Sequence, residues 1–322
     1  MTLLLVYLGV GLVLLFAAAE RFVFGASALA NNLRVSPLLI GVVIVGFGTS
    51  APELLVSAIA ALDDKSGLAI GNAIGSNITN IALILGLAAL IRPLTVHSQV
   101  LRRELPILLA AMLVCWVLLS NGRIDRTDGT LLLLAFGAMM YWMISVARRA
   151  HQEGDDSLAV PLPEGVVRVS NARAITWLVI GLLVLLASSR LLVWAAVELA
   201  EQWGISDLVI GLTVVAVGTS LPELAASTAA AFRRMDDIAI GNVVGSNTFN
   251  TLAVLGLPGV ISPGPFAAEV LTRDVPIMVV LTLALFAMGY GLGSSGRINR
   301  AEGAALLAAF VGYQWLLFGG GF

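Results

Sequence analysis

The chain has 322 residues, of which 59% are hydrophobic and only 12% are charged. Charged residues make up about 25% of an average soluble domain. This composition excludes a disordered chain, a nucleic-acid-binding protein and an ordinary cytosolic enzyme, and it predicts a membrane protein with several spans. The single cysteine, Cys115, excludes an internal disulfide framework and any metal site made of several cysteines.

Apolar stretches long enough to cross a bilayer recur along the chain. A helix needs about 20 apolar residues to span the hydrocarbon core. Ten stretches qualify, and they run over residues 2–30, 37–62, 67–91, 104–119, 127–147, 171–200, 207–232, 237–261, 274–293 and 302–318. They are too uniformly apolar for barrel strands, and the first lacks the basic start of a signal peptide. The sequence therefore predicts an all-α polytopic membrane protein with ten transmembrane helices.

The distribution of Lys and Arg predicts the orientation. With the N-terminus outside, the inside loops hold 12 of the 18 basic residues and the outside loops hold 4, while Arg21 and Arg190 lie within spans. Basic residues favour the cytoplasmic side, so both termini are expected outside. Residues 148–170 form the longest polar connection and are expected to be a cytoplasmic linker.

The chain contains two copies of one unit. Residues 35–93 match residues 205–263 at a constant shift of 170, with 27 identities in 59 positions and no gap. Polar, glycine and proline positions match, which indicates an internal duplication. Each half, 1–147 and 171–322, holds five predicted spans. Because five is odd, the second copy enters the membrane from the opposite face, and such inverted repeats are typical of secondary transporters.

Two carboxylates, Glu53 and Glu223, lie within predicted spans. A carboxylate in hydrocarbon is costly and marks a functional site by default. Pro52 and Pro222 follow Gly48 and Gly218 within four residues, so both spans are expected to break there and to free carbonyl groups. The carbonyls of residues 46 and 216 are the candidate ligands among them.

Hydroxyl and amide side chains accompany the two carboxylates. Thr49 and Thr219 each lie four residues before a glutamate and share its helical face. The next spans carry polar stripes at a spacing of four, made of Asn72, Ser76 and Asn80 in one half and Asn242, Ser246 and Asn250 in the other. Together these groups predict an all-oxygen site for hard cations such as Ca²⁺ and Na⁺. Two readings stay open for the amides at 72, 77, 242 and 247, namely ion binding and hydrogen bonding between helices.

The motifs Gly-Thr-Ser-x-Pro-Glu (48–53 and 218–223) and Gly-Asn-x-x-Gly-Ser-Asn (71–77 and 241–247) occur in both halves. This pair resembles the cation/calcium antiporter superfamily, above all its bacterial sodium/calcium exchanger branch. The resemblance covers the whole chain. It implies a multi-pass inner-membrane antiporter that expels Ca²⁺ in exchange for Na⁺ by alternating access, in which the first and sixth spans slide past the core. No cofactor, nucleic acid or obligate protein partner is implied beyond the ions and the lipid bilayer.

The resemblance also assigns roles to individual residues. Glu53 and Glu223 would be the central carboxylates shared by Ca²⁺ and Na⁺, and Thr49 and Thr219 would add Ca²⁺ contacts. The residues expected to line flanking Na⁺ positions are Ser50, Ser76, Ser220 and Ser246. Asn80 matches an amide of the family, whereas Asn250 stands where sodium-exchanging relatives have Asp.

Asn250 keeps a second reading open, that of a Ca²⁺/H⁺ antiporter in which Glu53 and Glu223 are protonated in turn. An ion channel is disfavoured because a continuous wet pore would expose more polar positions than these clustered motifs provide. An intramembrane enzyme is disfavoured because no His-Glu-x-x-His or Gly-x-Gly-Asp motif is present.

Overall fold

The computed structural model describes residues 2–33, 37–96, 103–153, 169–202, 216–290 and 296–319, and these are almost entirely helical. By length and composition, six helices in this part of the chain can cross a membrane, or seven if the bent pair Gly41–Thr49 and Ala51–Leu62 is one span. The predicted span 207–232 lies partly outside the described residues, and the count of ten stays a prediction.

The first half contains one long helix followed by shorter elements. In chain order they are α1 (Thr2–Leu33), α2 (Pro37–Ile40), the π-helix η1 (Gly41–Val45), α3 (Gly46–Thr49), α4 (Ala51–Leu62), α5 (Ser66–Thr79), the π-helix η2 (Asn80–Leu85), α6 (Gly86–Ile91), β1 (Leu94–Thr95), α7 (Leu105–Leu119), β2 (Arg123–Ile124) and α8 (Arg126–Glu153). α8 continues six residues beyond the predicted end of its span, because residues 148–153 are mostly good helix formers.

The second half repeats this order. Its elements are α9 (Asn171–Gln202), α11 (Ala216–Thr219), α12 (Leu221–Phe232), α13 (Asp236–Phe249), the π-helix η6 (Asn250–Val254), α14 (Gly256–Ile261), β3 (Gly264–Pro265), the π-helix η7 (Val270–Asp274), α15 (Val275–Tyr290), β4 (Arg297–Ile298) and α16 (Arg300–Gly319).

The correspondence between the halves extends to single residues. α12 and α13 begin 170 residues after α4 and α5 and have the same lengths as them. The turn after α4 contains Asp64 with φ 58°, and its counterpart after α12 contains Arg234 with φ 60°. The short strands pair between the halves, β1 with β4 and β2 with β3, so each two-stranded sheet contains one strand from each half.

The predicted break in the second span is confirmed. The helix axis bends by 48° between Thr49 and Ala51. Ser50 leaves the helical region there, with φ −81° and ψ 6°, and Ser220 does the same at φ −86° and ψ 7°. Pro52 and Pro222 then lie in the first turn of the new helix, where a missing N–H costs nothing.

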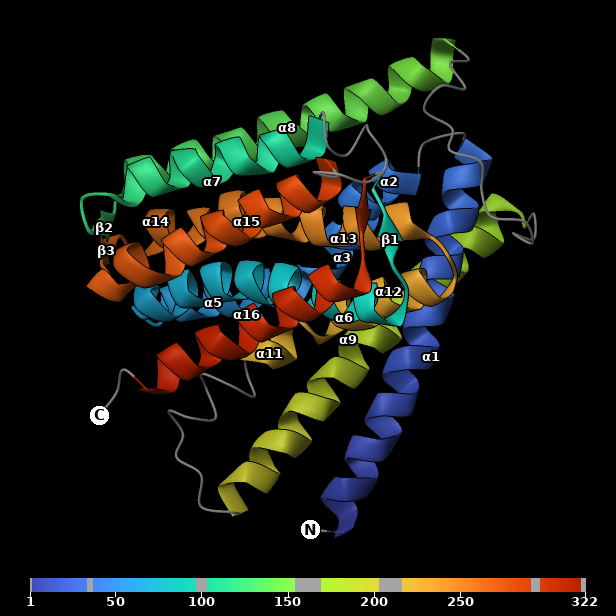
Figure 1. Ribbon diagram of the computed structural model, residues 1–322, viewed down its shortest axis with the longest axis horizontal. Helices are drawn as coiled ribbons and strands as arrows, with labels where there is room; N and C mark the ends of the chain where they lie inside the picture. Colours follow the sequence, from blue (N-terminus) through green and yellow to red (C-terminus); the bar gives the residue numbers. More distant parts are fainter. Residues whose placement is uncertain are drawn as a thin grey trace.

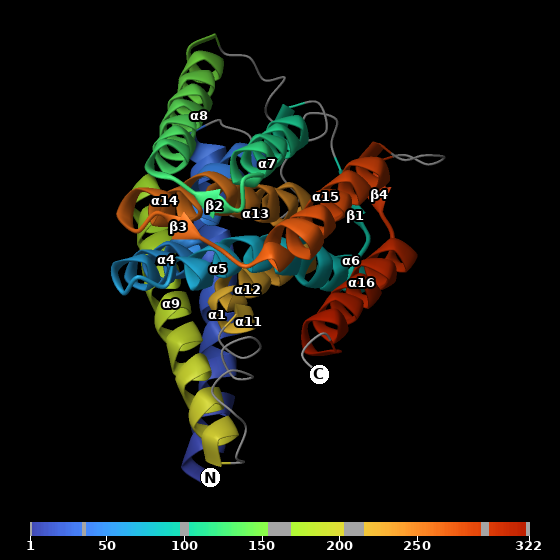
Figure 2. The same cartoon turned by 90° about the vertical axis from the view of Figure 1, so that its left-hand side faces the viewer.

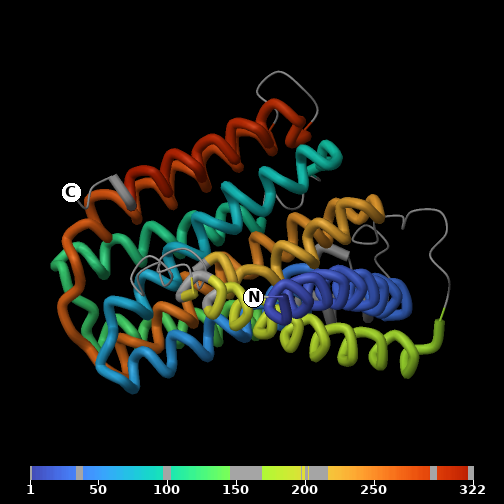
Figure 3. Tube along the Cα trace, turned by 90° about the horizontal axis from the view of Figure 1, so that it is seen from below, coloured from blue at the N-terminus to red at the C-terminus, as the bar shows by residue number. Residues whose placement is uncertain are grey.

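α13 lies in the interior of the molecule, while α16 (red) and α9 (yellow-green) lie on opposite sides of it (Figure 3). α13 is buried at every residue, and most of α5 from Ala73 onwards is buried as well. Each of these helices changes to a π-helix at a predicted ligand, Asn80 in η2 and Asn250 in η6. A π-turn often marks a functional site, because the extra residue re-aims the side chains around it.

The two long helices α1 and α9 lie side by side and extend together beyond the rest of the molecule (Figures 1 and 2). They run antiparallel, since Tyr7 near the start of α1 contacts Trp194 near the end of α9, with ring centroids 5.5 Å apart. Their backbones approach closely at two glycines. A Cβ atom on Gly25 would lie 2.5 Å from the Leu178 nitrogen, and one on Gly181 would lie 2.7 Å from the Phe22 nitrogen.

We expect Gly25→Ala to destabilise the folded protein by about 1–3 kcal/mol. The added methyl group would overlap backbone atoms of α9, which can move only if the helix itself shifts. The thermal midpoint of the purified protein in detergent measures this. Gly9→Ala is the matched control on the same helix, since a Cβ there meets nothing within 4 Å. Equal midpoints for the two variants would contradict the close packing of α1 on α9.

Candidate functional site

The two glutamates occupy equivalent places in the halves. Glu53 lies in the first turn of α4 and Glu223 in the first turn of α12, and both side chains are fully buried. The N-terminus of a helix carries a partial positive charge, which stabilises a carboxylate in its first turn. Each glutamate accepts a hydrogen bond from the serine three residues before the other glutamate, so the two like charges lie in one site and repel each other. A cation between them would relieve that repulsion.

Hydroxyl groups link each glutamate to the opposite half. The Ser50 hydroxyl donates to Glu223 Oε1 at 3.1 Å, and the Ser220 hydroxyl donates to Glu53 Oε1 at 3.4 Å. Thr219 contributes a further hydroxyl to Glu53. Because every one of these contacts joins the two halves, the site lies at their interface.

Thr49 and Ser246 extend the cluster on the Glu223 side. The Thr49 hydroxyl lies 3.0 Å from Asn242 Oδ1 and 3.4 Å from the Ser246 hydroxyl. Ser246 in turn donates to Glu223 Oε1 at 3.4 Å. The predicted grouping of Thr49, Ser246 and Glu223 in one cluster is therefore present in the structure.

Several buried oxygens of the predicted site residues make no hydrogen bond to any protein group that the structure describes. They are Oε2 of Glu53, Oε2 of Glu223, the hydroxyl of Ser76, and Oδ1 of both Asn80 and Asn250. A buried acceptor without a partner is unusual and needs an explanation. Carboxylate, hydroxyl and amide oxygens are the ligands that Ca²⁺ and Na⁺ prefer, so this donor set fits a hard cation.

The structure separates the amides whose role the sequence left open. The Asn72 amide donates to the Glu53 carbonyl at 3.2 Å, and the Asn242 amide donates to the Glu223 carbonyl at 3.2 Å. These amides fix the backbone that carries each carboxylate. Asn77 and Asn247 hydrogen-bond across to the opposite half, to Thr251 at 2.9 Å and to the Asn77 carbonyl at 3.2 Å. Helix-to-helix bonding is the observed role of all four.

The prediction that the break frees the Gly46 carbonyl is wrong. This carbonyl accepts the Ser50 backbone N–H at 3.0 Å, as in an uninterrupted helix. It nonetheless lies at the site, 3.4 Å from the Ser246 hydroxyl. The contacts of the carbonyl of residue 216 stay a prediction, because that residue begins the described segment. Pro222 has no N–H to donate to the Gly218 carbonyl. This carbonyl accepts a hydrogen bond from the Ser189 hydroxyl of α9 at 3.1 Å instead.

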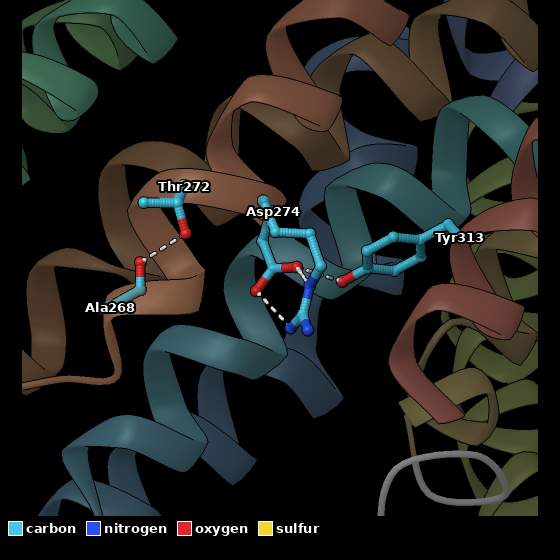
Figure 4. Close-up of polar contacts among 5 residues, drawn as sticks. Ala268, Thr272, Asp274 and Tyr313 are labelled. Atoms are coloured by element: carbon cyan, nitrogen blue, oxygen red, sulfur yellow. Dashed lines mark hydrogen bonds and ion pairs between the residues drawn. The ribbon is translucent and has the colours of Figure 1, made fainter. Parts of the chain in front are cut away.

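A second buried ionic cluster lies away from the glutamates, where η7 joins α15. Asp274 receives hydrogen bonds from Arg273 at 2.7 and 3.2 Å and from the Tyr313 hydroxyl at 3.1 Å (Figure 4). This carboxylate is satisfied by its neighbours, unlike those of Glu53 and Glu223. The sequence predicts both histidines in loops. His97 lies outside the described residues, whereas for His151 the prediction is wrong, because this residue lies in the last turn of α8.

Comparison with known proteins gives the family. The model of the sodium/calcium exchanger protein family matches residues 3–145 and 173–319. The chain belongs to this family. It is a multi-pass membrane protein and a cation/Ca²⁺ antiporter rather than an enzyme, of the bacterial branch of the superfamily that the duplicated motifs predict.

Relatives of this exchanger match along nearly its whole length. It is 47% identical to the putative antiporter CaxA of Alkalimonas amylolytica over 314 residues, which covers 97% of this chain and 98% of that protein. It is 41% identical to the inner membrane protein YrbG of Escherichia coli, covering 96% and 95%. A structure of the sodium-calcium exchanger NCX_Mj soaked with Na⁺ and Ca²⁺ superposes with a TM-score of 0.81 at 32% identity and covers 96% of each chain.

Proposed function

We propose that this exchanger moves Ca²⁺ out of the cell in exchange for Na⁺ through one site between Glu53 and Glu223. The observation that carries the proposal is the pair of buried carboxylates, each with one oxygen that no described protein group satisfies. Two negative charges balance one Ca²⁺ or two Na⁺ ions. A site that is neutral when occupied and negative when empty resists crossing the membrane empty, which suits obligate exchange.

The ligand set that we propose combines carboxylates, hydroxyls and amides from both halves. It consists of Glu53, Glu223, Thr49, Thr219, Ser50, Ser220, Ser76, Ser246, Asn80 and Asn250. The unsatisfied oxygens of Ser76, Asn80 and Asn250 support their inclusion, as does the approach of Ser50 and Ser220 to the glutamates. The Thr49 hydroxyl already hydrogen-bonds Asn242 Oδ1 and the Ser246 hydroxyl. Its oxygen can therefore bind an ion only in addition to these two hydrogen bonds.

We further propose that the halves 1–147 and 171–322 are inverted repeats of five spans each, joined by a cytoplasmic linker at 148–170. The antiparallel contact of α1 with α9 supports opposite orientations in the membrane. The bonds of Asn77 with Thr251 and of Asn80 with Asn247 support the same relation for the central helices, because one number rises as the other falls. The positive charges of the loops favour both termini outside, and the similarity to YrbG supports the inner membrane.

Calcium uptake into proteoliposomes tests the coupling ion. Vesicles with purified protein are loaded with Na⁺ and diluted into Na⁺-free buffer containing ⁴⁵Ca²⁺, with and without an imposed pH gradient. Uptake that requires the Na⁺ gradient is expected. The second candidate, Ca²⁺/H⁺ antiport, is favoured by the neutral Asn250, and uptake that follows the pH gradient and ignores Na⁺ would select it.

Asn250→Asp is expected to alter the Na⁺ dependence or the stoichiometry of Ca²⁺ uptake more than it changes expression. Neither amide atom of Asn250 makes a hydrogen bond to the described residues, so the isosteric carboxylate breaks no contact. It adds a negative charge beside the proposed ion positions. Uptake measured against a series of Na⁺ concentrations reports the change, with Asn77→Asp as a comparison in which a donated bond is lost. An unaltered Na⁺ dependence in folded Asn250→Asp would remove this residue from the ligand set.

A further inference from the structure

Helix α1 carries an ion pair that fastens it to the core of the molecule. Glu20, on α1, pairs with Arg233, the residue that follows α12. The Arg233 guanidinium also lies 5.9 Å from the ring centroid of Phe24, one turn further along α1. These contacts join a long outer helix to the helix that carries Glu223.

The duplication places a second ion pair of reversed charge in the other half. At the shift of 170 residues, Glu20 corresponds to Arg190 on α9, and Arg233 corresponds to Asp63 at the end of α4. The alignment of α1 with α9 needs no gap, since Gly11 corresponds to Gly181 at the same shift. If the charges at these positions were unrelated, the two equivalent positions would rarely carry opposite charges in both halves.

The second pair is not formed in this structure. Arg190 and Asp63 are both exposed, and no ion pair joins them. The surrounding surfaces show the same asymmetry. On α12, the face towards α1 is buried, with Ala225 0% and Ala229 8% exposed. On α4, the equivalent Leu55 and Ile59 are 46% and 49% exposed.

We propose that Glu20–Arg233 and Arg190–Asp63 are alternating latches of the transport cycle. In the conformation described here, α1 is closed on α12 and the first latch is engaged. When α1 and α9 shift together to open the site to the other side, the first latch separates, α9 closes on α4 and the second latch forms. This inference rests on the proposed exchange, carried out by the alternating access that the family resemblance implies, and it assigns these four residues a positioning role without contact to the ion.

Two latches of reversed charge, one in each half, can balance the two conformations of the transport cycle. Each latch stabilises one conformation, so the balance between the two conformations depends on the difference between two similar ion pairs. An exposed ion pair contributes little by itself, which keeps either latch from trapping the protein. The loss of one latch shifts the balance towards the conformation that the other stabilises.

Disulfide trapping tests the proposal in the full-length protein in proteoliposomes. Two double-cysteine variants report the two conformations, Glu20→Cys with Arg233→Cys and Asp63→Cys with Arg190→Cys. The single native cysteine, Cys115, is buried and stays in place. The control is Glu20→Cys with Asp63→Cys, which combines one member of each latch. Both latch variants are expected to form a disulfide under mild oxidation and to lose Ca²⁺ flux until a reductant is added, while the control does neither.

Neutralising one latch should speed trapping of the other. Glu20→Gln in the Asp63/Arg190 cysteine variant is expected to raise its rate of disulfide formation about 1.5- to 5-fold, the range for the loss of an exposed ion pair. Arg190→Gln in the Glu20/Arg233 cysteine variant should act in the same direction. If Asp63→Cys and Arg190→Cys never form a disulfide, or if Glu20→Gln leaves their rate unchanged, the proposal is overturned. Disulfide rates need no knowledge of the coupling ion, so the result stands apart from failure of Na⁺/Ca²⁺ exchange itself.

Discussion

Replacing either central glutamate by glutamine is expected to abolish Ca²⁺ flux, by at least about 100-fold, while folded protein stays in the membrane. Glu53→Gln and Glu223→Gln each remove one negative charge from a fully buried site. The remaining single charge cannot balance a divalent ion, and an unbalanced charge in a low-dielectric interior costs several kcal/mol, where about 1.4 kcal/mol is already tenfold.

The measurement is ⁴⁵Ca²⁺ uptake by proteoliposomes containing equal amounts of each variant, with elution on gel filtration as the check of folding. Glu269→Gln is a matched control, because it removes a carboxylate of the same type that is exposed before η7, outside the site. It is expected to retain flux. Normal flux in folded Glu53→Gln or Glu223→Gln would remove that carboxylate from the ion site.

The second large effect is expected for Asn242→Asp, which should destabilise the folded protein by about 3 kcal/mol or more and eliminate transport. The Asn242 amide donates to the Glu223 carbonyl at 3.2 Å and to the Ser227 hydroxyl at 2.8 Å. The aspartate keeps the shape but loses the N–H donor, so at least the carbonyl is left facing an acceptor. A buried polar group left unpaired costs about 1–3 kcal/mol, and more when a charge is involved.

Thermal unfolding in detergent and Ca²⁺ uptake together measure this effect. Asn250→Asp is the matched comparison, since it makes the same chemical change at an amide without a described partner. We expect a large fall in the midpoint for Asn242→Asp and a smaller fall for Asn250→Asp, which buries the same charge but breaks no hydrogen bond among the described residues. Similar midpoints for the two variants would show that Asn242 does not tether the Glu223 backbone.

The sequence could predict those features that depend on residue type alone. Glycine, proline and glutamate recur at the same spacing in both halves, so the duplication, the break at Ser50 and the central carboxylates could be read directly. The confirmed family also follows from these motifs. Each of these features is local, which is why no three-dimensional information was needed.

Other features depend on contacts between distant segments and could not be predicted. The π-helices that begin at Asn80 and Asn250 have no composition signal. The role of Asn72 and Asn242 depends on which helix lies opposite, because an asparagine side chain can either hydrogen-bond a neighbouring backbone or bind an ion. The Gly46 carbonyl is not freed, because the helix continues for one further residue, to Ser50, before it bends. The ion pair of Glu20 with Arg233 joins residues 213 positions apart.

Calcium binding to the purified protein tests the two-glutamate site most directly. Equilibrium dialysis with ⁴⁵Ca²⁺ measures the number of ions bound per chain in the presence and absence of Na⁺, for the native protein and for the double variant Glu53→Gln, Glu223→Gln. The site described here predicts one Ca²⁺ per native chain, displaced by Na⁺, and none in the folded double variant. Undiminished binding in the double variant would contradict a Ca²⁺ site between these two carboxylates.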